Sequence, residues 1–133
     1  MNIDWKYAEK VADLSVFDEI GEMMEIDFPE ELKELILAAN ASMPSPNKFT
    51  VGGKERVLGE ILAFTHDEEE DSEDVFSTIE DLELNNIIPF AADPFGNYIG
   101  YSVTDGKVVF YDHECDEVES TGKSLSEFIN SLY

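Results

Sequence analysis

A succession of turn and capping signals between residues 88 and 129 constrains the fold more than any other feature. Asp93-Pro94-Phe95-Gly96 follows an apolar run and is typical of a tight turn, because proline presets φ and glycine tolerates positive φ. Asp105-Gly106 is a β-hairpin signal. Ser124 and Glu127 have the spacing of a capping box at a helix start. We therefore expect a strand, a turn, two paired strands and a closing helix, in this order.

The hairpin signal also predicts a register. The predicted pairs are Val103 with Val108, Tyr101 with Phe110, and Ile99 with Asp112. This register places the apolar members of the pairs on one face of the sheet, whereas a shift by one residue would mix them with the opposite face. The closing helix carries an apolar stripe that we expect to dock on the sheet, formed by Leu125, Phe128, Ile129 and Leu132.

The first third of the chain is predicted to be helical. Apolar spacing favours helices over residues 4–14, 15–24 and 29–40. Ser15 is the expected N-cap of the second helix, and Pro29 suits the first helical position of the third.

The middle of the chain holds the weaker signals. Residues 41–54 contain two prolines and a Gly-Gly pair, so a loop is predicted there. Residues 57–64 are apolar on both faces, which predicts a strand in the interior of a sheet. An acidic run at 66–74 follows, and Asp71 or Ser72 is expected to cap a short helix carrying Val75, Ile79 and Leu82. Together the elements predict a single α+β domain over residues 1–133, with a mainly antiparallel twisted sheet flanked by N-terminal helices and a C-terminal helix.

The charge balance restricts the partners. The chain has 31 acidic and 8 basic residues, for a net charge of −23. Such a chain repels phosphate, so nucleic acid and anionic membranes are poor partners, whereas a cationic macromolecule is a better one. High negative charge also keeps a protein soluble, and composition does not separate the two roles. A lone cysteine, and no basic segment leading into an apolar stretch at the N-terminus, predict a cytoplasmic protein.

The motifs of known catalytic and metal sites are incomplete in this sequence. His113-Glu114 begins like a zinc-protease signature, but Glu117 stands where the second histidine is required. Asp112, His113 and Cys115 are too few for a tetrahedral site without His66, and the acidic run lacks the spacing of a calcium loop. Neighbouring acids should raise the pKa of the Cys115 thiol and reduce its reactivity. We expect no catalytic residue, cofactor or metal site, and a metal-dependent enzyme is the weaker alternative.

Four segments, taken in order, carry a family resemblance. They are Ile26-Asp27-Phe28-Pro29-Glu30-Glu31-Leu32, Gly59-Glu60-Ile61-Leu62-Ala63-Phe64, the run from Ile88 to Asn97, and Val108 to Glu114 with Ser126-Glu127-Phe128-Ile129. Together they resemble the SUKH superfamily, which includes yeast cell-wall assembly regulators and bacterial toxin-immunity proteins. The resemblance covers about residues 15–133. Tyr111 stands where the family often has tryptophan, and Leu125 where phenylalanine is usual.

The resemblance implies a non-enzymatic immunity protein that binds and neutralises a secreted toxin domain, often a nuclease. A regulatory or scaffold module is the alternative within the binding class. A nuclease is basic where it holds phosphates, so an acidic inhibitor would be steered to it. The sequence does not indicate an oligomeric state. The expected partner-binding carboxylates are Asp67, Glu68, Glu69, Glu70, Asp71, Glu73, Asp74, Asp112, Glu114, Asp116, Glu117 and Glu119.

Overall fold

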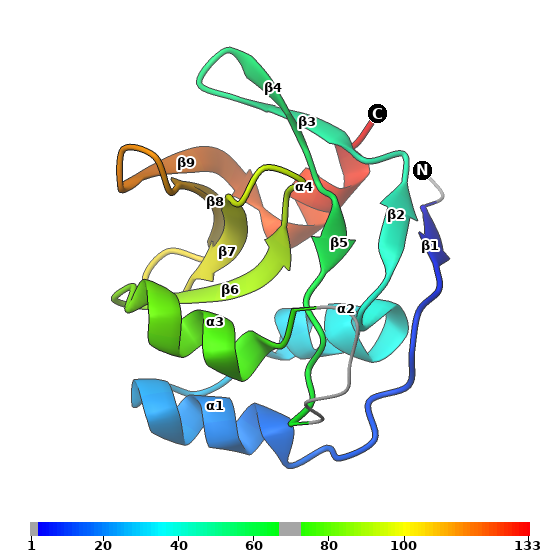
Figure 1. Cartoon of the computed structure of the whole chain (residues 1–133), viewed down its shortest axis with the longest axis vertical. Coiled ribbons are helices and arrows are strands. Elements are labelled where there is room, and N and C mark those ends of the chain that lie inside the picture. Colours follow the sequence, from blue (N-terminus) through cyan, green and yellow to red (C-terminus); the bar gives the residue numbers. More distant parts are fainter. Residues whose placement is uncertain (1–2, 67–72) are drawn as a thin grey trace.

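The computed structural model describes residues 3–66 and 73–133 and has an α+β fold (Figure 1). A five-stranded antiparallel sheet has the order β5-β6-β7-β8-β9, and two smaller antiparallel pairs join β1 with β2 and β3 with β4. The strands are β1 (Asp4–Lys6), β2 (Met43–Ser45), β3 (Lys48–Val51), β4 (Lys54–Val57), β5 (Glu60–Ile61), β6 (Ile87–Ala92), β7 (Tyr98–Ser102), β8 (Lys107–Asp112) and β9 (Glu117–Ser124). The helices are α1 (Val16–Met24), α2 (Glu30–Ala39), α3 (Val75–Leu82) and α4 (Leu125–Asn130).

Two aromatic clusters join the sheet to the elements around it. Phe17 of α1 lies 5.1 Å from Phe28 and 5.9 Å from Phe64, measured between ring centroids. Phe49 of β3 lies 6.1 Å from Phe110 of β8 and 5.0 Å from Phe128 of α4. The first cluster fixes α1 and α2 near the end of β5, and the second fixes the β3–β4 hairpin and α4 near the β8–β9 end of the sheet. In Figure 1 these two groups lie toward opposite ends of the molecule.

The closing helix and the apolar face of the hairpin agree with the sequence. Ser124 Oγ accepts from the Glu127 N–H while the Glu127 carboxylate accepts from the Ser124 N–H, so the predicted capping box is confirmed. Leu125, Phe128 and Leu132 are buried. The predicted helices at 15–24 and 29–40 correspond to α1 and α2, although no side-chain hydrogen bond caps α1 from Ser15, whose hydroxyl instead donates to Asp13.

The predicted register is wrong by two residues. Tyr101 lies opposite Val108 and Ile99 opposite Phe110. The loop is longer than two residues because the Gly106 N–H donates to the Ser102 carbonyl, which closes a turn over residues 103–105. Since the shift is even, the predicted apolar face is kept.

The predicted helix over residues 4–14 is also wrong. Residues 4–6 form β1, in which Trp5 lies opposite Pro44 of β2. Tyr7 has a φ of 64°, which ends this strand and excludes a right-handed helix through the residue.

Three further expectations for the middle of the chain need correction. The predicted loop at 41–54 contains β2 and β3, and Gly52 and Gly53, both at positive φ, make the turn of the β3–β4 hairpin. The predicted strand at 57–64 is only β5, at an edge of the sheet rather than in its interior. Residues 61–64 are nevertheless buried, and the Ile61 N–H donates to the Ser42 carbonyl outside the sheet. The cap of α3 is Asp74, which accepts from the Ser77 N–H, rather than Asp71 or Ser72.

Candidate functional site: an acidic face

The turn between β6 and β7 is held by two buried polar side chains. Asp93 and Asn97 are only 8% and 5% exposed. Asp93 Oδ1 accepts from the N–H groups of Phe95 and Asn97 at 2.9 and 2.8 Å, and its Oδ2 accepts from Asn97 Nδ2 at 2.9 Å. Every oxygen of this buried carboxylate therefore has a partner, which fixes the backbone of the turn.

The same turn is tied to the β8–β9 turn at residues 113–116. Asn97 Oδ1 accepts from the His113 N–H at 3.1 Å and contacts His113 Nδ1 at 2.7 Å. Tyr111 donates to Asp116 Oδ1 at 2.7 Å, so this carboxylate is held beside the sheet. The hydrogen bond to Asp116 is the larger cause of a raised pKa of the Tyr111 phenol, and the burial of Tyr111 raises this pKa further.

The start of α3 reaches the same side of the sheet. The Tyr98 hydroxyl donates to Glu73 Oε2 at 2.5 Å. Burial, followed by Glu73 and by weaker effects of Asp81 and Asp93, raises the pKa of Tyr98 well above its usual range. Tyr98 lies directly opposite Tyr111 in the sheet, so the two phenols and the carboxylates they bind share one face.

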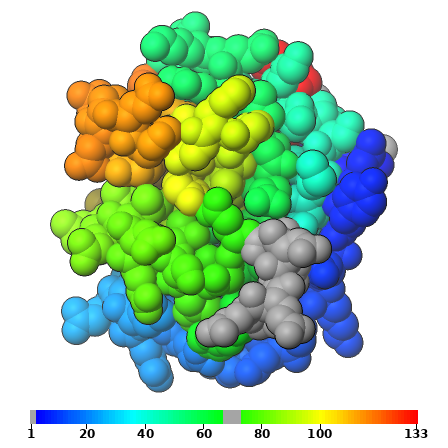
Figure 2. All heavy atoms as spheres, in the orientation of Figure 1, coloured from blue at the N-terminus to red at the C-terminus, as the bar shows by residue number. Residues whose placement is uncertain are grey.

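We define the acidic face as the two bound carboxylates, Glu73 and Asp116, together with Asp74 before α3, Asp81 on α3 and Glu114 in the β8–β9 turn. Figure 2 shows the elements that carry them on one side of the molecule, with the turn of residues 93–97 (yellow) adjoining both α3 (green) and the β8–β9 turn (orange). Asp81 was not predicted from the sequence, because helical spacing alone does not show that α3 faces Tyr98.

The predicted partner-binding residues divide into three groups. Glu73, Asp74, Glu114 and Asp116 belong to the acidic face. Asp112, Glu117 and Glu119 lie on the opposite side of the sheet, since the pairs Asp112–Glu117 and Phe110–Glu119 alternate with the pair Tyr111–Val118. Asp67, Glu68, Glu69, Glu70 and Asp71 lie outside the described residues.

The carboxylates on the opposite side are partly neutralised by basic residues of β4. Asp112 Oδ2 lies 3.8 Å from the Arg56 guanidinium, which also stands 4.6 Å from the centroid of the Phe110 ring. Together with Lys54, Glu117 and Glu119 they line a cavity of about 370 Å³. Because positive charge accompanies the carboxylates here, this cavity is a weaker site for a cation than the acidic face.

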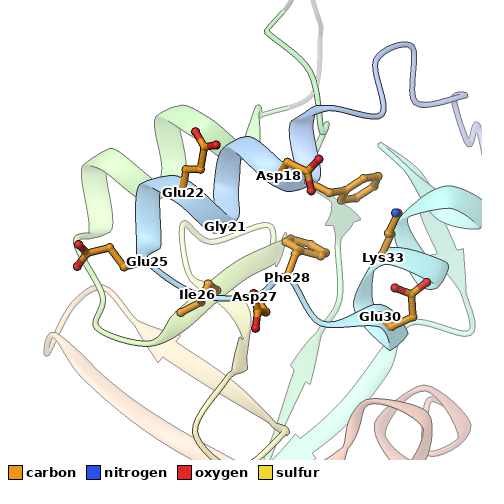
Figure 3. Close-up of a pocket in the computed structure, with 10 residues that line it drawn as sticks. Asp18, Gly21, Glu22, Glu25, Ile26, Asp27, Phe28, Glu30 and Lys33 are labelled. Carbon is orange, nitrogen blue, oxygen red and sulfur yellow. The ribbon is translucent and has the colours of Figure 1, made fainter.

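A second acidic surface was not predicted at all. A groove of about 810 Å³ lies along α1 and the segment that leads into α2 (Figure 3). Phe28, Phe17 and Lys33 are among its lining residues, and the Lys33 ammonium stands 5.5 Å from the Phe17 ring centroid. The acidic residues that line the groove are Asp18, Glu22, Glu25, Asp27 and Glu30. Sequence spacing could have suggested this groove, since Asp18, Glu22 and Glu25 recur at helical intervals.

The residues considered for metal or thiol chemistry are His66, His113 and Cys115. The two histidines have different partners, and the environment of Cys115 disfavours its reactive thiolate form. His66 contacts Glu19 Oε2 at 2.5 Å and stacks on Phe76, whereas His113 binds Asn97. Within residues 3–66 and 73–133, no group of three or more His, Cys, Asp or Glu side chains is arranged to hold a metal ion. Burial, with Asp112 and Glu117, raises the pKa of the Cys115 thiol, which is the predicted direction.

Comparison with known families identifies the fold. A family model described as SMI1-KNR4 cell-wall, SUKH_6, matches residues 17–129, most of the chain. The chain belongs to the SUKH family. The matched range contains all four segments that carried the resemblance, so the predicted membership of the SUKH superfamily is confirmed. Membership of the SUKH family is consistent with an immunity or related protein-binding role.

No curated protein matches the sequence. No helix in the described part of this SUKH chain is both long and apolar enough to span a bilayer.

Proposed function

We propose that this chain is a non-enzymatic immunity protein that binds and neutralises a cationic toxin domain, a nuclease, in the cytoplasm. The observation that carries the proposal is the acidic face, where Glu73, just before α3, is held by the half-buried Tyr98 and Asp116 of the β8–β9 turn is held by the buried Tyr111. Carboxylates that are held in place before binding lose less side-chain entropy on binding than free ones. The family membership supports a protein-binding role.

Electrostatics favours a nuclease as the partner. The net charge of −23 gives a long-range attraction to a basic protein and a repulsion from nucleic acid. A nuclease presents basic groups where it binds phosphates, so an acidic face placed there would accelerate association and block the substrate.

Co-purification tests the proposal. The chain is expressed with an affinity tag beside the product of the neighbouring gene, and the pair is tested for a stable complex and for inhibition of nucleic-acid cleavage. The proposal expects a complex in equal proportions and loss of nuclease activity. A complex without inhibition of any toxic activity would favour the regulatory or scaffold module, and no complex would contradict the immunity function.

A further inference from the structure

Phe95 is an exposed aromatic residue on a turn that is otherwise built from polar groups. Its side chain is 72% exposed, whereas the other eight phenylalanines of the chain are buried or half-buried. A single exposed apolar residue is common on protein surfaces and needs no function by itself. The position of Phe95 is therefore what carries the inference.

The backbone beneath Phe95 is unusually well held. The Phe95 N–H donates to Asp93 Oδ1, and the buried Asp93–Asn97 pair is connected in turn to His113. Gly96 has a φ of 89°, and the His113 ring lies so close to it that a side chain at this position would press on the ring. The turn thus presents Phe95 to solvent with little backbone freedom to lose on binding.

The surroundings of Phe95 have the anatomy of a protein interface. The turn of residues 93–97 adjoins both α3 and the β8–β9 turn on the face seen in Figure 2. The carboxylates of the acidic face lie on α3, directly before it, and in the β8–β9 turn, so the turn that carries the exposed Phe95 lies between charged segments. Interfaces commonly have this arrangement, in which a central aromatic anchor carries much of the binding energy and a polar rim excludes water.

We propose that Phe95 is the apolar anchor of the acidic face and inserts into an apolar pocket bordered by basic residues on a cationic protein partner. This inference rests on the proposed function and refines it, because it assigns the affinity chiefly to one side chain. The carboxylates then contribute association rate and orientation, while the Phe95 ring contributes the lifetime of the complex.

Binding kinetics of three variants test this assignment, with the toxin domain encoded by the neighbouring gene as the probe. Phe95→Ala should weaken binding by about 30-fold or more through faster dissociation, as for other aromatic anchors. Phe95→Tyr keeps the ring and should retain most of the affinity. Tyr7→Ala is the matched control, because Tyr7 is 79% exposed but lies near β1, away from the acidic face.

Two readouts separate an anchor from a structural role. The melting temperature of Phe95→Ala should equal that of the unchanged protein, since an exposed ring contributes little to folding. The loss of affinity should also be the same at low and high salt, because the ring carries no charge. If Phe95→Ala binds the toxin domain as tightly as Tyr7→Ala does, the proposal that Phe95 is the anchor is contradicted, while the proposed function stands. If the unchanged protein does not bind the probe, the proposed function fails, and the anchor fails with it.

Discussion

Single side chains join the helices to the sheet through tyrosine–carboxylate hydrogen bonds. Tyr101 of β7 donates to Glu31 of α2 at 2.6 Å. Burial, followed by Glu31, raises the pKa of Tyr101 to about 12. The folded state therefore holds this proton more tightly than the unfolded chain, in which a tyrosine has a pKa of about 10. The stability that this proton provides is complete below pH 10 and is lost as the pH rises toward 12.

We expect the free energy of unfolding to fall between about pH 10 and pH 12, and Tyr101→Phe to reduce this fall. At neutral pH the same substitution should cost about 1 kcal/mol, because Glu31 loses its donor. Urea unfolding at neutral and high pH measures both effects. Tyr98 and Tyr111, whose pKa values are also raised, keep part of the pH dependence in the variant. An identical pH dependence in Tyr101→Phe and the unchanged protein would contradict the assignment.

At the scale of the elements, the turn between β6 and β7 is held in place by the buried side chains of Asp93 and Asn97. Asp93 accepts three hydrogen bonds and joins the end of β6 to the start of β7. Asp93→Ala removes both acceptor oxygens and with them all three hydrogen bonds, and should destabilise the fold by about 3 kcal/mol, since buried donors are left without partners. Chemical denaturation measures this loss. Asp105→Ala is the control, because Asp105 is exposed and accepts an exposed hydrogen bond from the Lys107 N–H; an equal loss in both variants would contradict the role of Asp93.

The elements that could be predicted are those with strong local signals. The capping box of Ser124 and Glu127 marks the start of α4, and the alternation of apolar residues fixes which side of β7 and β8 is buried. The helix expected at 4–14 failed because Trp5, Ala8 and Ala12 happen to have helical spacing while β2 offers a backbone partner for the chain. The spacing of apolar residues within a segment carries no information about a strand partner that lies far away in the sequence.

The candidate site was less predictable than the fold, for a related reason. Charge and the acidic segments are visible in the sequence, but the side of the sheet on which each carboxylate lies depends on the register at β8 and β9. Asp112 and Asp116 are four residues apart, yet one binds Arg56 and the other Tyr111. The exposure of Phe95 depends on how the Asp93–Asn97 pair turns the chain, and the turn signal alone does not reveal this.

At the scale of the whole molecule, the 31 acidic residues far outnumber the 8 basic ones. With a net charge of −23, self-repulsion opposes the compact state. Raising the salt concentration from about 0.01 M to about 0.15 M shortens the screening length from about 30 Å to about 8 Å. We expect the melting temperature to rise by about 3 °C or more over this range. Sodium and potassium chloride should act equally; an unchanged melting temperature would contradict significant self-repulsion.

The central claim is that the acidic face, rather than net charge alone, binds a cationic partner. Its most direct test is the association rate with the toxin domain of the neighbouring gene, measured over a range of salt concentrations. The face variant Glu73→Gln/Glu114→Gln/Asp116→Asn keeps the acceptors for Tyr98 and Tyr111. The groove variant Asp18→Asn/Glu22→Gln/Asp27→Asn removes the same number of charges elsewhere.

The account predicts that the face variant associates about tenfold more slowly at low salt and shows a weaker salt dependence, because steering charges at an interface act mainly on the association rate. The groove variant should lose much less, since its three charges lie away from the contact. Equal association rates and salt dependences for the two variants would contradict the acidic face as the binding surface.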